Sequence, residues 1–117
     1  MLASIKHRIS RDQIVYSLDK AHSPVLEIDS GDVITFETYD ARTGTIQKDE
    51  DLLDRPHPIG ANPVTGPVVV RGAEPGDALC VDIQQIKLAD EGFLGVKAGM
   101  GLLGSQTRNY ATKMVKV

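Results

Sequence analysis

Several residue types are scarce in this chain of 117 residues, and each scarcity excludes a class of protein. Tryptophan is absent and only three Tyr and two Phe occur, so we expect an aliphatic core. A single cysteine, Cys80, excludes an internal disulfide framework. No apolar run approaches the roughly 20 residues that cross a bilayer. The first residues also lack the apolar stretch of a secretory signal. We therefore expect no membrane association and a cytoplasmic location.

Charge and motif content narrow the function further. A net charge of -3 argues against binding to nucleic acid, which needs clustered Lys and Arg. The sequence lacks the Gly-x-Ser-x-Gly and His-Glu-x-x-His motifs and any paired-Cys motif. Residues 99–104 have the spacing G-x-G-x-x-G, but no strand–helix context surrounds them, which disfavours nucleotide binding. We expect Cys80 to be a packed structural residue, because a reactive thiol needs an exposed site that favours the thiolate.

Two stretches alternate apolar and polar residues with the period of a β-strand. In the first, after the Gly-Asp pair at residues 31–32, Ile34 and Phe36 fall on one face. In the second, after the Gly-Asp pair at residues 76–77, Leu79, Val81 and Ile83 share a face. We predict a strand in each stretch.

Each predicted strand follows a turn that ends in Gly-Asp, and each turn follows another plausible strand, at residues 25–28 and 68–71. Pro75 and Gly76 suit the two central positions of a type II turn, the second of which requires a positive φ. This pattern predicts two hairpin-like units of similar construction.

The remaining segments give weaker signals. Strands are predicted at residues 4–9, 13–18 and 110–117, and the charged stretch 43–60 is predicted to be a long surface loop with a helical turn near 49–54. Such a strand-rich composition, poor in helix and rich in turns, predicts one all-β domain over residues 1–117. We expect a β-sandwich or a barrel-like domain of hairpins with long loops.

A conformationally restricted loop occupies residues 62–67, with the sequence NPVTGP. Pro63 and Pro67 each fix one backbone angle, and Gly66 permits conformations closed to other residues. Asn62 and Thr65 carry its only hydrogen-bonding side chains. They could bind a ligand, or they could stabilise the turn by bonding nearby backbone groups.

This loop and the following GAEPGD at residues 72–77 resemble a signature of the acetamidase/formamidase family, whose members hydrolyse short amides to a carboxylate and ammonia. Residues 25–40 are similar to an earlier strand pair of the family, and residues 92–104 to its glycine-rich segment, so the resemblance runs over residues 22–104. It implies a β-sandwich. Family members are considerably longer, and the chain resembles their amino-terminal portion.

Amide hydrolysis needs an attacking water or nucleophile, donors for the oxyanion and an acid for the departing ammonia. Glu37 and Asp40 follow a predicted strand and could act as a general base or as metal ligands. The alternative is a solvated strand end, with Asp40 capping a turn. His57, held between two prolines, is a candidate for acid–base chemistry. Together with the resemblance, these residues imply Asp40, Glu37 and His57 as catalytic groups and Asn62 and Thr65 as substrate-binding groups.

The histidines show no ligand spacing, so a metal site would be assembled from distant segments. Its candidate ligands are Asp40, His57 and His22, and the metal they would suit is divalent, zinc or calcium; the sequence leaves open whether one is bound. The alternative for each histidine is a surface or packing role.

The resulting interpretation is an amide hydrolase domain or subunit that acts on a small amide such as formamide or acetamide. It would require the missing portion of the family sequence, supplied within a homo-oligomer or by a companion subunit. The alternative is a non-catalytic β-domain that binds a partner chain or a small ligand.

Overall fold

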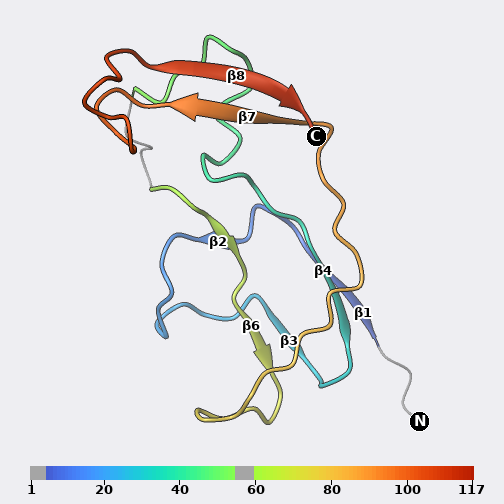
Figure 1. The fold of residues 1–117 in the computed structure, drawn as a ribbon. Helices are drawn as coiled ribbons and strands as arrows, with labels where there is room; N and C mark the ends of the chain where they lie inside the picture. The colour runs from blue at the N-terminus through green and yellow to red at the C-terminus, as the bar shows by residue number, and fades with distance from the viewer. Residues whose placement is uncertain (1–4, 55–59) are drawn as a thin grey trace. The chain divides into compact units, whose positions relative to one another are not determined.

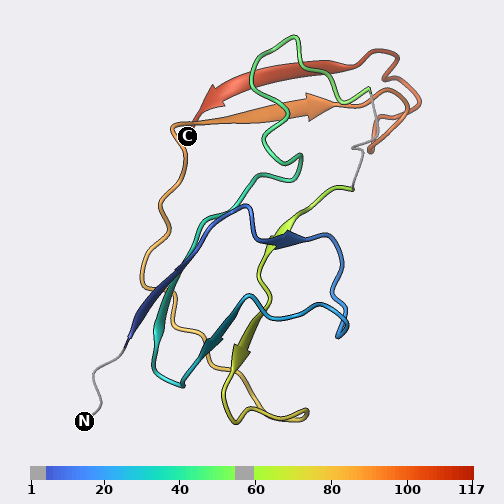
Figure 2. The same cartoon turned by 180° about the vertical axis from the view of Figure 1, so that it is seen from behind.

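The computed structural model describes residues 5–54 and 60–117, and these residues form strands without any helix. The strands are β1 (Lys6–Ile9), β2 (Ile14–Val15), β3 (Leu26–Ile28), β4 (Val33–Phe36), β5 (Val64–Thr65), β6 (Val68–Val70), β7 (Glu91–Val96) and β8 (Ala111–Lys116). They form four two-stranded sheets (Figures 1 and 2). The all-β prediction is confirmed. The barrel-like alternative is wrong for the described part of the chain, because these small sheets do not close into a barrel.

The chain divides into two compact units. The first consists of Met1–Thr43 and Ile59–Cys80 and contains β1 to β6. The second consists of Gly44–Pro58 and Val81–Val117 and contains the antiparallel pair β7–β8. Over the two described ranges, no helix is long and apolar enough to span a membrane.

Within the first unit, the strands on either side of the first Gly-Asp turn pair with other strands and not with each other. β3 pairs with β6 and β4 pairs with β1, both in parallel. The predicted hairpin-like units are therefore wrong. An alternating pattern reports which face of a strand is buried, but it does not specify which strand forms the neighbouring hydrogen bonds. Ile9, at the end of β1, is only 1% exposed and is the most deeply buried side chain described.

The two Gly-Asp turns do share one construction, as the sequence suggests. In the first, Asp32 N donates to Asp29 O (3.1 Å) while Asp32 Oδ2 accepts from Asp29 N (3.0 Å). In the second, Asp77 N donates to Glu74 O (3.0 Å) while Asp77 Oδ2 accepts from Glu74 N (2.9 Å). The glycine before each aspartate has a positive φ, 93° at position 31 and 104° at position 76. The repeat is real at the level of the turns.

Several strand predictions are confirmed and others fail. The predictions at residues 4–9 and 110–117 correspond to β1 and β8, whereas the prediction at 13–18 shrinks to the two residues of β2. Residues 49–54 form turns and no helix, because the stretch is too polar to bury a face. The predicted strand through Leu79, Val81 and Ile83 is absent, since no described strand pairs with it. Cys80, predicted to be packed, is exposed for the same reason.

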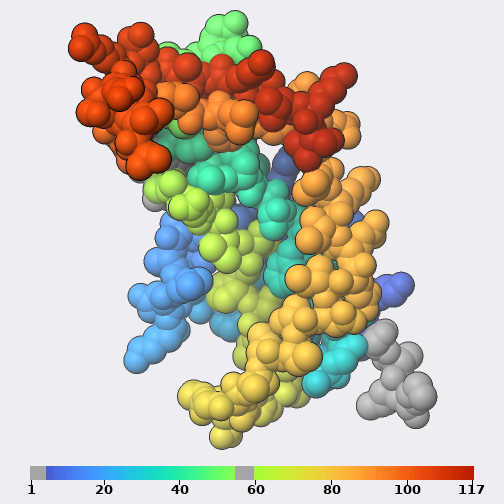
Figure 3. All heavy atoms as spheres, viewed as in Figure 1, coloured from blue at the N-terminus to red at the C-terminus, as the bar shows by residue number. Residues whose placement is uncertain are grey.

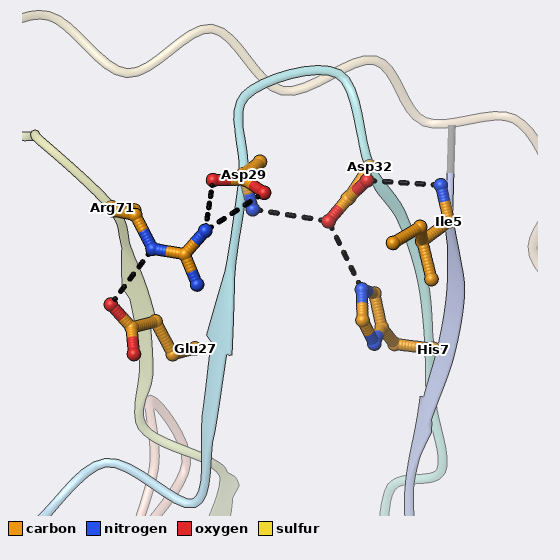
Figure 4. A network of polar contacts seen from close by, with 6 residues as sticks. All are labelled: Ile5, His7, Glu27, Asp29, Asp32 and Arg71. Atoms are coloured by element: carbon orange, nitrogen blue, oxygen red, sulfur yellow. Dashed lines mark hydrogen bonds and ion pairs between the residues drawn. The ribbon is translucent and has the colours of Figure 1, made fainter. Parts of the chain in front are cut away.

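A polar network ties the ends of β1, β3, β4 and β6 together (Figure 4). At its centre, Asp32 accepts hydrogen bonds from the backbone N–H groups of Asp29 and Ile5, both at 3.0 Å. His7 Nε2 lies 3.0 Å from Asp32 Oδ2. Arg71 bonds both oxygens of Asp29 at 2.8 and 3.0 Å and contacts Glu27 at 3.3 Å. The hydrogen bond from Asp29 N, then those from His7 and Ile5, hold the pKa of Asp32 below its ordinary value of 3.8.

This lowered pKa predicts a pH dependence of stability. Because the folded-state pKa of Asp32 lies below its unfolded value, its contribution is complete above the unfolded pKa and is lost as the pH falls through the folded one. Urea unfolding of the wild-type chain should show a free energy that falls as the pH drops from about 5 to about 2, and the fall should be smaller in Asp32→Asn. The exposed Asp54→Asn serves as control. Equal pH slopes in the wild type and Asp32→Asn would contradict the assignment.

Candidate functional site

The loop at residues 62–67 is held firmly at its carboxyl end. β5 pairs with β2 in an antiparallel register, and Gly66 N continues that ladder by donating to Gln13 O at 2.9 Å. One residue later, Pro67 O accepts from Val25 N at 2.9 Å. Gly66 is buried and has a φ of 129°, which an L side chain rarely adopts. The predicted rigidity therefore has a structural basis on both sides of the glycine.

Two further hydrogen bonds place this loop alongside the segment that follows β4. Thr65 Oγ1 donates to Glu37 O at 2.7 Å, and Asn62 N donates to Ala41 O at 2.9 Å. Asn62 adopts a left-handed φ of 61°. The structure thus brings four predicted site residues onto two adjacent segments, residues 37–41 and 62–65. We call this arrangement the loop–strand site; its candidate side chains are Glu37, Asp40, Asn62 and Thr65.

The carboxylate of Glu37 is engaged by Arg8. Arg8 Nε donates to Glu37 Oε1 at 2.8 Å, and the Nη2 atom of the same guanidinium contacts the same oxygen. The Arg8 hydrogen bonds and charge, together with a hydrogen bond from the Arg11 backbone, lower the pKa of Glu37 from its ordinary value. A lowered pKa favours the ionised form and makes a carboxyl group a poorer proton donor near neutral pH. The sequence analysis missed Arg8, because the sequence does not show that the strand carrying it pairs with β4.

Asp40 is exposed and forms a local turn. Its Oδ1 atom accepts from Arg42 N at 2.6 Å, and its carbonyl oxygen accepts from Thr43 N at 3.0 Å. Thr43 has a φ of 57°, and its hydroxyl lies 2.9 Å from the Tyr16 hydroxyl. The turn-capping interpretation of Asp40 thus has direct support. Capping through one oxygen holds the carboxylate in a fixed orientation beside the loop, which a catalytic or ligating group also requires.

Of the two candidate histidines, only His22 lies among the described residues, and it does not join this group. His22 Nε2 lies 2.9 Å from Ser17 Oγ, beside a hollow of about 280 Å³ that Val64 and Pro67 also line. Successive side chains of a strand point to opposite faces, so the hollow beside Val64 is on the other face of β5 from the Thr65–Glu37 contact. His57 lies outside the described residues, and its predicted role stays a prediction.

The residues described show no group of three or more His, Cys, Asp or Glu side chains arranged to hold a metal. The predicted ligand set of Asp40, His57 and His22 stays untested, because one of its members lies outside the described residues. Within the loop–strand site itself, the oxygen-bearing groups would suit a hard divalent cation better than a thiol-binding one.

The acetamidase/formamidase family profile matches residues 13–116 of this chain. Three solved structures are similar. A recombinant predicted acetamidase/formamidase from the thermophile Thermoanaerobacter tengcongensis has 35% identity and a TM-score of 0.90, over 98% of this chain. An acetamidase from Bacillus halodurans has 33% identity and a TM-score of 0.88, over 93% of this chain. An acetamidase from Yersinia enterocolitica, 20% identical with a TM-score of 0.72 over 97% of this chain, shares the fold. No curated protein shows significant similarity.

The family match covers most of the chain, and the strands and turns that carry it are those described above. The described residues form an all-β architecture. The chain belongs to the acetamidase/formamidase family. It spans 38%, 37% and 39% of the three solved chains, respectively.

Proposed function

We propose that this chain forms part of an amide hydrolase and that the loop–strand site is one wall of its substrate pocket. The observation that carries the proposal is the pair of hydrogen bonds from Thr65 to Glu37 O and from Asn62 to Ala41 O. They fix the family's characteristic loop next to the carboxylate-bearing end of β4. A preorganised arrangement of this kind is what catalysis of an unreactive bond requires.

The residues of this wall can be given roles by their chemistry. Asp40 is our candidate for a general base or metal ligand, because its turn holds the carboxylate beside the loop. The Asn62 side chain, which is exposed, can offer both a donor and an acceptor to an amide substrate. Thr65 has already donated its hydroxyl hydrogen to Glu37 O, so it can only accept from a substrate N–H group.

The substrate that we propose is a short aliphatic amide such as formamide or acetamide. The remainder of the site would come from the part of the family fold that this chain does not span, in a companion subunit or a homo-oligomer. If a divalent metal is bound, Asp40 is the ligand that this wall offers, and the metal would polarise the amide carbonyl or activate water.

The test is ammonia release by a chimera in which residues 1–117 replace the matching part of the Thermoanaerobacter tengcongensis protein. We expect the chimera to release ammonia from formamide or acetamide and residues 1–117 alone to release none. The assay is run with and without a chelator and with added zinc or calcium, and the parental protein is the reference. A folded chimera that is inactive beside an active parent, under every metal condition, would favour the non-catalytic binding domain instead.

A further inference from the structure

A long stretch between the second Gly-Asp turn and β7 forms no regular structure. Residues 78–89 contain no strand, helix or turn, and no hydrogen bond between described residues involves them. Figure 1 shows this stretch as a continuous coil that leads into β7, and Figure 3 shows its atoms at the surface. Buried backbone groups are almost always paired, and exposed strand edges readily pair with another chain. An extended stretch of this length without partners is therefore a candidate for strand addition.

The side chains of this stretch are those of a strand that is half buried. Leu79, Val81 and Ile83 are exposed by 73%, 70% and 70%, and they alternate with Cys80 and Asp82. The apolar positions then continue as Ile86 and Leu88, shifted by one residue after the glutamine pair at 84–85. A one-residue shift is what a β-bulge produces while keeping the apolar side chains on one face. A run of exposed apolar side chains of this kind is typical of an interaction site.

Comparison of the two Gly-Asp turns and the strands around them shows that the first part of this stretch lacks a strand partner among the described residues. β3 and β6 precede the two matching turns, and they pair with each other. After the first turn comes β4, which pairs with β1 in parallel over four residues. Residues 78–83 follow the second turn, in the position equivalent to β4, and they have no described partner. The repeat therefore contains a place for one more strand.

We propose that residues 78–83 are a docking strand for a β-strand of the portion of the family fold that this chain does not span. The structural match covers 98% of this chain but only 38% of the Thermoanaerobacter tengcongensis protein. The relative therefore has ample further sequence to supply such a strand. Backbone hydrogen bonds would provide the affinity of this strand addition, and the side chains of Leu79, Val81 and Ile83 would provide its specificity. The proposal does not depend on amide hydrolysis.

A second copy of this chain is a poorer occupant. Pairing the segment with itself across a two-fold axis gives antiparallel strands, whereas both strand pairs of the repeat are parallel. The repeat therefore favours a strand of different sequence over self-association.

Hydrogen exchange tests the proposal in residues 1–117 alone and in the chimera defined above. We expect amides 79–83 to exchange at nearly the unprotected rate in the isolated chain and about 100-fold more slowly in the chimera. The triple variant L79K/V81K/I83K should abolish this protection. The control L18K/L102K/L103K, which changes three other exposed leucines, should retain it. Protection of β7–β8 amides reports in every sample that the protein is folded.

Each alternative outcome overturns the proposal. These outcomes are a folded chimera with unprotected residues 78–83, protection that survives the triple variant, or protection in the isolated chain accompanied by a dimeric mass. Should the chimera not fold, the isolated chain is mixed with the separately produced remainder of the relative, and alkylation of the exposed Cys80 is followed. If no complex forms in that mixture and Cys80 is alkylated as fast as in the isolated chain, the proposal is also overturned.

Discussion

Replacing Asp40 by asparagine in the chimera is expected to lower kcat for formamide by on the order of 10²–10⁴-fold. The free energy of unfolding should stay unchanged, because the asparagine side-chain oxygen can still accept the hydrogen bond from Arg42 N that now goes to Asp40 Oδ1. The substitution removes the negative charge and the ability of the carboxylate to take up a proton. Urea unfolding measures the stability, and the rate of ammonia release at saturating amide measures kcat.

Asp19 provides a matched control, since it caps a turn in the same way. Its Oδ1 atom accepts from Ala21 N at 2.8 Å, and its carbonyl oxygen accepts from His22 N at 3.1 Å. Asp19→Asn should therefore leave kcat unchanged. If Asp40→Asn and Asp19→Asn behave alike, Asp40 is only a turn cap and leaves the list of catalytic candidates.

Replacing Gly66 by alanine is expected to destabilise the chain by about 1–3 kcal/mol, through backbone strain. Its φ of 129° is unfavourable for an L residue, whereas the added Cβ meets no atom closer than Val68 N at 3.5 Å. Relief of the strain would move Thr65 relative to Glu37 O, so kcat/KM of the chimera should fall as well. Urea unfolding of the isolated chain and amide hydrolysis by the chimera measure the two effects.

Gly92→Ala is the control, because Gly92 does not have a positive φ and its added Cβ would meet only Val117 Cγ2, at 3.3 Å. We expect a change of about 0.5 kcal/mol or less at this half-buried position, because the exposed side chain of Val117 can move aside. A Gly66→Ala chain as stable as Gly92→Ala would show that the loop relaxes without cost, and the rigidity argument for the site would be wrong.

The sequence predicts the local features of this fold well and its strand pairing poorly. Proline and glycine restrict φ by themselves, so the turn at Pro75 and Gly76 could be recognised from two residues. Strand pairing depends on segments that lie far apart in the chain. β4 pairs with β1 and β3 pairs with β6, whereas the sequence analysis predicts that β3 and β4 form a hairpin. The segment around Val81 has the pattern of a strand but lacks a described partner, and no local signal reveals that.

For the candidate site, the residue types were informative and their environments were not. The loop containing Asn62 and Thr65 was recognisable, and the structure places it beside Glu37 and Asp40. The pairing of Glu37 with Arg8 could not be foreseen, because it depends on the parallel register of β1 and β4. His22, grouped with Asp40 by residue type, lies against Ser17 beside the hollow on the Val64 side of β5.

The most direct test of the loop–strand site is a map of backbone amide chemical shifts in the folded chimera as acetamide is added. The amides of residues 1–117 are observed. The account predicts that the chemical shifts of residues 40–43 and 62–66 change and then saturate as acetamide is added. Residues 29–32, at the distant Gly-Asp turn, should not shift. Saturable shifts confined to other residues, in a chimera that releases ammonia, would contradict the account.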